Sequence, residues 1–265
     1  MRIKSNFYKM KLMNQKCLIL IAISLFFSAS LFAQDYQAYI KKGDQYYEQF
    51  KNKLALAEYK KAYKIAPNDY EVLMRLARAY NDVGEDIGTD EAESYYIEAI
   101  KYAKILQERF PNKAETYFYL VVSEGNLAQL KGGKEKIRLG RNIETYAKKI
   151  IALDPKFYQG YVVLGVYYRE VANLNWVLKN FAKTLFGGLP DVTNEDSAKM
   201  LLKSIEIKPS VIGYYELGVT YKEMGAIDKS IESLKKALEL PVDDHQDMQR
   251  KALARELINK LQKDR

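Results

Sequence analysis

The sequence predicts an all-α fold of packed helices, and three observations support this prediction. The 265 residues include only 6 prolines and 14 glycines, which is too few for the frequent turns of a β-rich domain. Ala, Leu, Lys and Glu, which favour helices, are abundant between them. Small and aromatic residues also recur at fixed offsets along the chain, as a helical repeat requires.

A first repeat surrounds Gly43. Two antiparallel helices approach closely only where small side chains lie at their crossing, and aromatic side chains then fill the neighbouring space. Proline lacks an amide donor, so it ends the second helix. Six residues fit this scheme at offsets 0, +3, +12, +16, +19 and +24, namely Gly43, Tyr46, Ala55, Tyr59, Ala62 and Pro67. These are the spacings of a tetratricopeptide repeat.

Further repeats follow along the chain. Gly218 and Leu234 near the far end have the same +16 offset as Gly43 and Tyr59, and Gly165 marks a first helix between them. The second helices should end at Pro67, Pro111, Pro155, Pro209 and Pro241, which are separated by 44, 44, 54 and 32 residues. A standard unit has about 34 residues. The sequence therefore predicts a tetratricopeptide-repeat α-solenoid of about five units over residues 34–265, with insertions in the middle repeats.

Three insertions and a last helix complete the predicted solenoid. The insertions are an extended helix running toward Phe110, the segment Leu130–Lys136 and the segment Val171–Asn194. After Pro241, an amphipathic helix over Met248–Lys263 should cap the open end of the stack. Its apolar face consists of Leu253, Leu257, Ile258 and Leu261.

The first 33 residues differ in character from the rest. Several lysines precede an apolar run from Leu18 to Phe32, and a small residue, Ala33, follows it. This pattern predicts a signal peptide over residues 1–33 that is cleaved after Ala33. The mature protein would then be periplasmic or secreted. An uncleaved membrane anchor is the alternative, and it is the one way in which we expect the chain to contact a membrane.

Charge and cysteine content limit the classes of function. Residues 1–33 contain five basic and no acidic residues, so their removal lowers the formal net charge from +8 to +3. Interspersed Lys and Glu describe a solvated helical surface, and we expect no nucleic-acid partner. The single cysteine, Cys17, lies in the same segment. The remaining chain therefore has no disulfide or thiolate chemistry.

The first helix of each unit lines the inner face of a tetratricopeptide stack, so positions on that face are candidate ligand contacts. Ile40 and Asp44 occupy positions where a basic clamp for a peptide's terminal carboxylate would have Lys and Asn, which argues against that use of the fold. The candidate contacts are mostly apolar and are Ile40, Tyr47, Met74, Arg78, Phe118, Val122, Val162, Val166 and Tyr215, with Trp176 at the entrance.

Two interpretations of these apolar positions remain open. They either form an accessible groove, or they are core because the insertion around Trp176, or the last helix, folds into the groove. Trp176 itself is either an aromatic contact for a ligand or an anchor that packs the insertion against the solenoid.

The residues do not support an enzyme. His245 is the one histidine, and the neighbouring Asp243 and Asp244 are better explained as caps of the last helix than as metal ligands. No cysteine or second histidine of the mature chain supplies a nucleophile and base pair. Glu85, Asp86, Asp90 and Glu91 cluster near a turn, but nothing places them in a pocket. We therefore expect no catalytic residues, no metal and no cofactor.

The insertions carry a family resemblance. Gly133–Ile137, Asn175-Trp176, Leu185–Gly187 with Pro190, and Ala237–Val242 resemble the regulator of microtubule dynamics family. The resemblance covers roughly residues 36–261. It implies helical adaptors that bind microtubules, organelle-contact partners or, in one mitochondrial tether, phospholipid. A weaker similarity is to the periplasmic tetratricopeptide subunit of some transporters.

Together these features predict a non-catalytic exported scaffold. Its partners would be proteins or peptides of the cell envelope, held in the mostly apolar groove. The alternative is a carrier of lipid or another small apolar ligand, or an accessory subunit of an envelope transporter.

Overall fold

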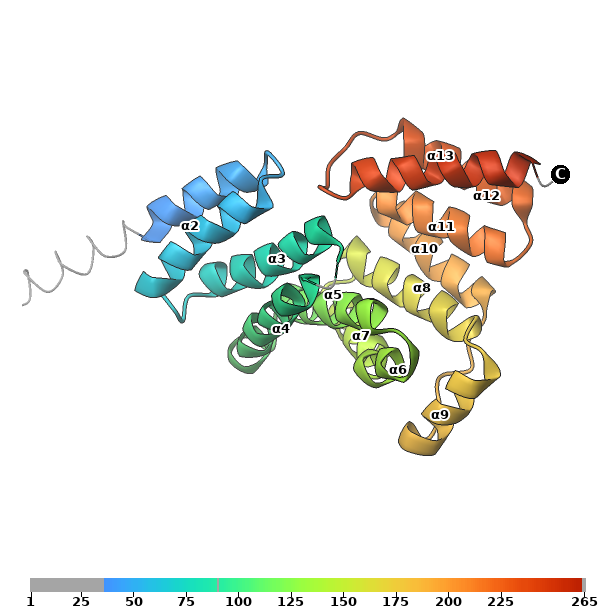
Figure 1. Ribbon diagram of the computed structural model, residues 1–265, viewed down its shortest axis with the longest axis horizontal. Helices are drawn as coiled ribbons and strands as arrows, with labels where there is room; N and C mark the ends of the chain where they lie inside the picture. The colour runs from blue at the N-terminus through green and yellow to red at the C-terminus, as the bar shows by residue number, and fades with distance from the viewer. Residues whose placement is uncertain (1–35, 90, 264–265) are drawn as a thin grey trace, which may run out of the picture. The chain divides into compact units, whose positions relative to one another are not determined.

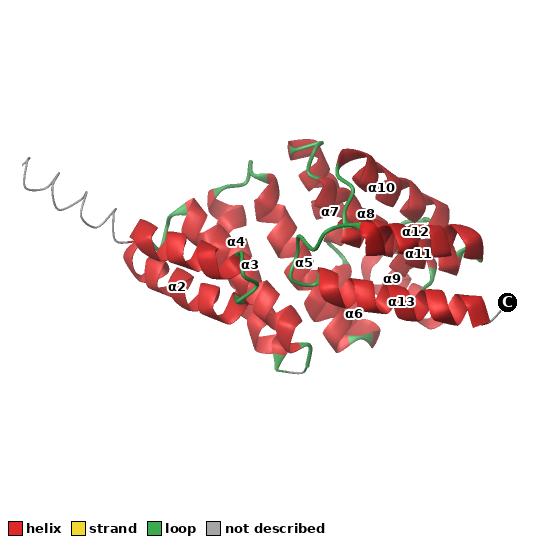
Figure 2. Cartoon of the chain, turned by 90° about the horizontal axis from the view of Figure 1, so that it is seen from above, coloured by secondary structure: helices red, strands yellow, loops and turns green. Residues whose placement is uncertain are grey.

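The computed structural model describes residues 36–89 and 91–263, and these form helices joined by turns and loops, with no strand (Figures 1 and 2). The predicted signal peptide and its cleavage after Ala33 lie outside the described residues. The chain divides into two compact units, Met1–Val72 and Leu73–Arg265.

The described residues of the first unit that precede α3 form a pair of helices, residues 36–47 and α2 (Asn52–Ile65). A methyl group at Gly43 would lie 2.3 Å from Tyr59 Cε1, so only glycine permits this crossing. The Tyr59 hydroxyl donates to Asp44 Oδ1 over 2.7 Å. Ala55, Tyr59 and Ala62 are fully buried. The repeat predicted around Gly43 is confirmed.

The second unit contains the remaining helices, and α3 crosses the boundary into it. Figure 1 labels them in chain order. They are α3 (Tyr70–Ile87), α4 (Ala92–Arg109), α5 (Ala114–Lys131), α6 (Gly133–Gly140), α7 (Ile143–Leu153), α8 (Tyr158–Ala172), α9 (Trp176–Phe186), α10 (Asn194–Ile207), α11 (Val211–Glu223), α12 (Ile227–Glu239) and α13 (Asp247–Lys263).

The five prolines end helices as predicted. α2, α4, α7, α10 and α12 each end two residues before one of them, at Ile65, Arg109, Leu153, Ile207 and Glu239. The residue before proline avoids the helical region, and proline itself offers no amide hydrogen. These two constraints together fix the end of every second helix.

Close helix crossings recur in the second unit. A methyl group at Gly218 would lie 2.6 Å from Leu234 Cγ, and one at Gly165 would lie 2.7 Å from Leu201 Cγ. The contact between α11 and α12 therefore repeats between α8 and α10, although α9 intervenes in the sequence. Leu201 and Leu234 are fully buried at these crossings.

Specific polar contacts delimit the α9 insertion. Asn173 and Asn194 exchange amide hydrogen bonds of 2.9 and 3.3 Å at its base. Asn175 caps the start of α9 by accepting from the Leu178 amide. Thr193 and Asp196 form a reciprocal capping box at the start of α10. The chain therefore leaves the repeat and returns to it at defined points.

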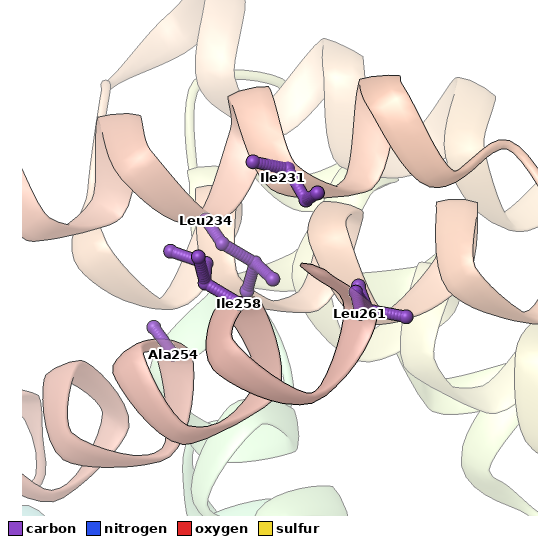
Figure 3. Close-up of a cluster of buried hydrophobic side chains, with 5 residues drawn as sticks. All are labelled: Ile231, Leu234, Ala254, Ile258 and Leu261. Atoms are coloured by element: carbon purple, nitrogen blue, oxygen red, sulfur yellow. The ribbon is translucent and has the colours of Figure 1, made fainter. Parts of the chain in front are cut away.

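The last helix covers the end of the second unit. Ala254, Ile258 and Leu261 of α13 form a buried cluster with Ile231 and Leu234 of α12 (Figure 3). Leu257 packs against this cluster. The predicted capping helix is present, but Leu253 is 41% exposed and does not belong to the buried face. Ala254, at 0% exposure, takes that place because a small residue lets α13 approach α12 closely.

Within residues 36–89 and 91–263, no helix combines the length and the apolar character needed to cross a membrane.

Candidate partner-binding surface

The predicted contacts fall in both units. Ile40 and Tyr47 lie on the helix formed by residues 36–47, where Ile40 is 5% exposed and Tyr47 is half-buried. Met74 and Arg78 lie on α3 in the second unit and are half-buried. Arg78 is engaged inside that unit, since its charge acts on Asp82 and it hydrogen-bonds to Tyr119. It is therefore not a free basic group for a ligand.

The other inner positions of the second unit pack against successive core clusters. Phe118 and Val122 border the cluster around Tyr117 and Ile150, and the rings of Phe118 and Phe157 are 5.2 Å apart. Val162 is buried beside Leu201, and Val166 borders the same cluster. Tyr215 packs against the α12–α13 cluster. Each side chain is thus at least partly committed to a local core.

The connection between α12 and α13 lies over part of the inner face. Lys208 at the end of α10 is 3.8 Å from Asp243, and Lys208 also lies over the ring of Tyr158 on α8. Burial, together with the charges of Asp244 and Asp247, raises the pKa of Tyr158. The ion pair places Asp243 beside the end of α10, and the charge effects indicate that Asp244 and Asp247 lie near Tyr158 at the start of α8. They support the interpretation in which the C-terminal segment covers part of the face.

The α9 insertion is the most exposed apolar element of the described chain. Trp176 is 75% exposed, Val177 59% and Leu185 50%. Its main helix contact is with α6, where Lys134 lies over the Phe181 ring at 5.1 Å. Trp176 therefore does not anchor the insertion by packing, and that interpretation is wrong. The indole instead lies mostly in solvent.

Lysines around the Gly132-Gly133 turn have partners within the unit. Lys131 pairs with Glu93 at 2.6 Å, Lys136 pairs with Glu170, and Lys134 lies over Phe181. Gly132 and Gly133 both have positive φ, of 64° and 50°, so this turn requires their conformational freedom. The lysines fix the turn between α5 and α6 and do not converge on an anion.

A cluster of possible metal ligands lies elsewhere in the second unit. Asp82 and Glu85 on α3 meet His245 from the α12–α13 connection. Burial and the Glu85 charge raise the pKa of Asp82 to about 7. Burial opposes the charge of His245, but the hydrogen bond to Glu85 and the Asp82 charge outweigh it and raise the pKa of His245 to about 10.

Sequence reasoning found only part of this cluster. Glu85 and Asp86 are predicted as members of one acidic group and His245 as a separate residue beside Asp243 and Asp244, whereas Asp82 is not predicted at all. The available signal was the spacing of Asp82, Glu85 and Asp86, which lie three and four residues apart and therefore on one face of α3. Asp244 acts near the helix start as expected, because its carboxylate accepts from the Gln246 amide. The Asp243 carboxylate instead lies 3.8 Å from Lys208, and the amides of Asp243 and Asp244 donate to Asp247.

The helix pairs, their glycine crossings and the proline stops define a tetratricopeptide-repeat α-solenoid. A thermophilic TPR protein of Thermus thermophilus has the same fold, with a TM-score of 0.61 and 20% identity over 83% of this chain and 99% of that chain. The chain itself belongs to the regulator of microtubule dynamics protein 1-3 family, whose model matches residues 39–262. The resemblance seen at the insertions is thereby confirmed.

Individual relatives support this assignment. Regulator of microtubule dynamics protein 3 of Bos taurus is 32% identical over 174 residues, which is 64% of this chain and 37% of that protein. Protein 1 of Bos taurus is 28% identical over 210 residues, 77% of this chain and 64% of that protein. The match thus spans between about a third and two thirds of the length of these relatives.

These relatives contradict the predicted periplasmic or secreted localisation. They are proteins of Mus musculus and Bos taurus, and they are named as regulators of microtubule dynamics, not as envelope or secreted proteins. The prediction depended on lysines followed by an apolar run. That pattern also suits segments that are not cleaved export signals, so it does not fix a destination.

Proposed function

We propose that this chain is a non-catalytic scaffold that binds a protein or peptide partner, and that α9 makes the principal contact. The supporting observation is the exposure of Trp176, Val177 and Leu185 on one short helix. Folded proteins seldom leave several large apolar side chains of one short helix in water without an interaction that covers them. Tryptophan is also enriched among residues that dominate binding energy.

The charge of α9 restricts the partner. The helix contains Lys179 and Lys183 and no acidic residue, so it favours an acidic rim around an apolar pocket. The family name makes microtubules a first candidate for such a partner. The more buried inner positions, among them Met74, Phe118 and Val166, would contribute a secondary contact.

The repeat architecture supports a scaffold in preference to an enzyme. Helix pairs that stack through fixed crossings present a rigid surface, and insertions such as α9 vary that surface without changing the stack. Rigid presentation reduces the entropy lost on binding. The repeats would therefore hold α9 in place for a partner.

Site-specific crosslinking tests this proposal. A photoreactive amino acid placed at position 176 in the full chain should give a discrete protein adduct in the native cell. The matched control is position 202, because Leu202 is 48% exposed but lies on α10. Equal adducts at both positions, or none at position 176, would contradict α9 as the contact.

A second measurement on the purified protein distinguishes the scaffold from the competing function, a carrier of lipid or another small apolar ligand. Native mass spectrometry of the purified chain should then find bound lipid, and crosslinks at position 176 should be absent. Co-sedimentation with microtubules, reduced by Trp176→Ala together with Leu185→Ala, would identify the partner directly.

A further inference from the structure

The α12–α13 connection brings His245 into contact with α3. Its partner there, Asp86, is 159 residues away in the sequence. The side chain of His245 is only 4% exposed, and its Nε2 lies 3.1 Å from Glu85 Oε2 and 3.7 Å from Asp82 Oδ1. One ligand atom from each of the three residues lies within 4.8 Å of the others. Ligands bound to one zinc ion at about 2.1 Å lie roughly 3 to 3.5 Å from each other. The 3.1 Å separation of His245 Nε2 from Glu85 Oε2 lies in this range, whereas the 3.7 Å separation of Nε2 from Asp82 Oδ1 would shorten on binding one cation.

Neighbouring groups orient two of these ligands. His245 Nδ1 lies 2.9 Å from Asp86 Oδ1, which directs Nε2 toward Glu85 and Asp82. Glu85 Oε1 accepts from Asn126 over 2.7 Å and from Asn81 over 3.1 Å. This leaves Glu85 Oε2 for His245. Metal-binding histidines and carboxylates are characteristically held in this way by a second layer of hydrogen bonds.

Asp82 supplies an independent indication of a ligand. Its side chain is 10% exposed, and its buried Oδ2 atom has no hydrogen-bond partner. A buried carboxylate oxygen without a donor is costly, because it has lost its water and gained nothing in exchange. The other oxygen, Oδ1, faces His245 Nε2 at 3.7 Å, so a cation bound by this carboxylate would offset that cost.

The local charge also favours a cation. Asp82, Glu85 and Asp86 all face His245. The nearby guanidinium of Arg250 is occupied by Asp244 at 2.8 Å and Asp247 at 3.2 Å. Three carboxylates thus face one imidazole. Arg78 supplies a further positive charge near Asp82. Paired buried charges are tolerated only when they balance.

We propose that Asp82, Glu85 and His245 bind one divalent cation of the zinc class, with Asp86, Asn81 and Asn126 as positioning residues. One nitrogen and two carboxylate oxygens suit Zn²⁺, and a fourth position would remain for water. The ion would fasten the α12–α13 connection to α3. This inference is independent of the partner proposed for α9.

Calorimetric titration with Zn²⁺ tests the proposal on the full chain after treatment with a chelator. We expect one equivalent to bind, and Asp82→Asn or His245→Gln to weaken binding at least about tenfold. Asp243→Asn is the matched control, since this acid lies in the same connection but pairs with Lys208. Cys17→Ser removes the one thiol, which could bind zinc by itself.

A spectroscopic measurement reads the site without relying on variants that might fold poorly. The chain has a single histidine, so imidazole ¹⁵N resonances in the unaltered protein report on His245 alone. Zn²⁺ should shift the Nε2 resonance selectively, with Nδ1 still hydrogen-bonded. An Nε2 resonance that does not change at saturating Zn²⁺, or affinity unchanged in both Asp82→Asn and His245→Gln, would overturn the proposal. The cluster would then be an ion-pair contact made by a charged histidine.

Discussion

The α8–α10 pair and the α9 helix between them in sequence differ in how their side chains are used. α8 and α10 meet through Gly165 and Leu201, and Leu201 is fully buried. α9 is the more apolar of the two segments that follow α8, yet it leaves Trp176 and Leu185 in solvent. Burial therefore follows the position in the repeat, and not hydrophobicity alone.

This difference separates two tasks within one stretch of chain. The repeat positions hold the stack together, since each glycine there accommodates a large side chain of the next helix. The insertion adds apolar surface that the stack does not need. Changes in the first region should reduce stability, whereas changes in the second should reduce binding.

The largest expected effect is at the crossing itself. Gly165→Ala would place a methyl group 2.7 Å from Leu201 Cγ and 3.2 Å from the Ser197 carbonyl oxygen. We expect the free energy of unfolding to fall by about 1–3 kcal/mol through overpacking, measured by urea denaturation with circular dichroism. Gly125→Ala is the control, because its methyl would meet nothing closer than 3.9 Å and should raise helix stability by up to about 1 kcal/mol. Equal changes in unfolding free energy for Gly165→Ala and Gly125→Ala would contradict a close crossing of α8 and α10 at Gly165.

A smaller effect is expected where the chain returns from the insertion. Thr193→Ala removes the side chain that accepts from the Asp196 amide at the start of α10. Loss of such a cap costs about 1 kcal/mol, measurable in the same denaturation experiment. Thr184→Ala within α9 should change stability by less than about 0.5 kcal/mol. A larger loss of unfolding free energy for Thr184→Ala than for Thr193→Ala would contradict the view that the repeat, and not α9, determines stability.

An acid-dependent effect is expected where α6 meets α8. Burial opposes the charge of Glu170, but the hydrogen bond and charge of Lys136 outweigh it and lower its pKa below the ordinary 4.5. The folded state then binds protons less readily, so this stabilisation is present above pH 4.5 and is lost as the pH falls through the lower folded pKa.

The measurement for this pair is unfolding free energy as a function of pH. Glu170→Gln should lose less stability on acidification than the unaltered chain, by under about 1 kcal/mol because the pair is partly exposed. Identical pH profiles for the two proteins would show that the pair contributes nothing.

The smallest effect on stability is expected at Trp176. Trp176→Ala should change the free energy of unfolding by less than about 0.5 kcal/mol, since the side chain is 75% exposed. Ala182→Asp in the same helix is the contrast, because Ala182 is fully buried and a buried charge there should detach α9 from α6. A loss of about 2 kcal/mol or more for Trp176→Ala would mean that the indole is part of the core.

The sequence predicted the repeat core because its determinants are local. Pro209 ends α10 through its own ring, and Gly218 with Leu234 requires only two adjacent helices. The predicted buried face of α13 was partly wrong. Leu253 and Ala254 are adjacent in the sequence, and only the packing against the neighbouring helix decides which of them is buried. The meeting of Asp82 with His245 depends on the accumulated geometry of every intervening helix pair. The spacing of residues within one repeat therefore does not predict this contact.

In most solenoids each repeat touches only its neighbours, and the end repeats fray independently. The contact between His245 and α3 joins the two ends of the second unit. Opening of α13 then exposes groups on α3 as well, which links their local unfolding into one cooperative event. Amide hydrogens of α13 should consequently exchange at rates tied to those of α3, rather than at the faster rate of a free terminal helix.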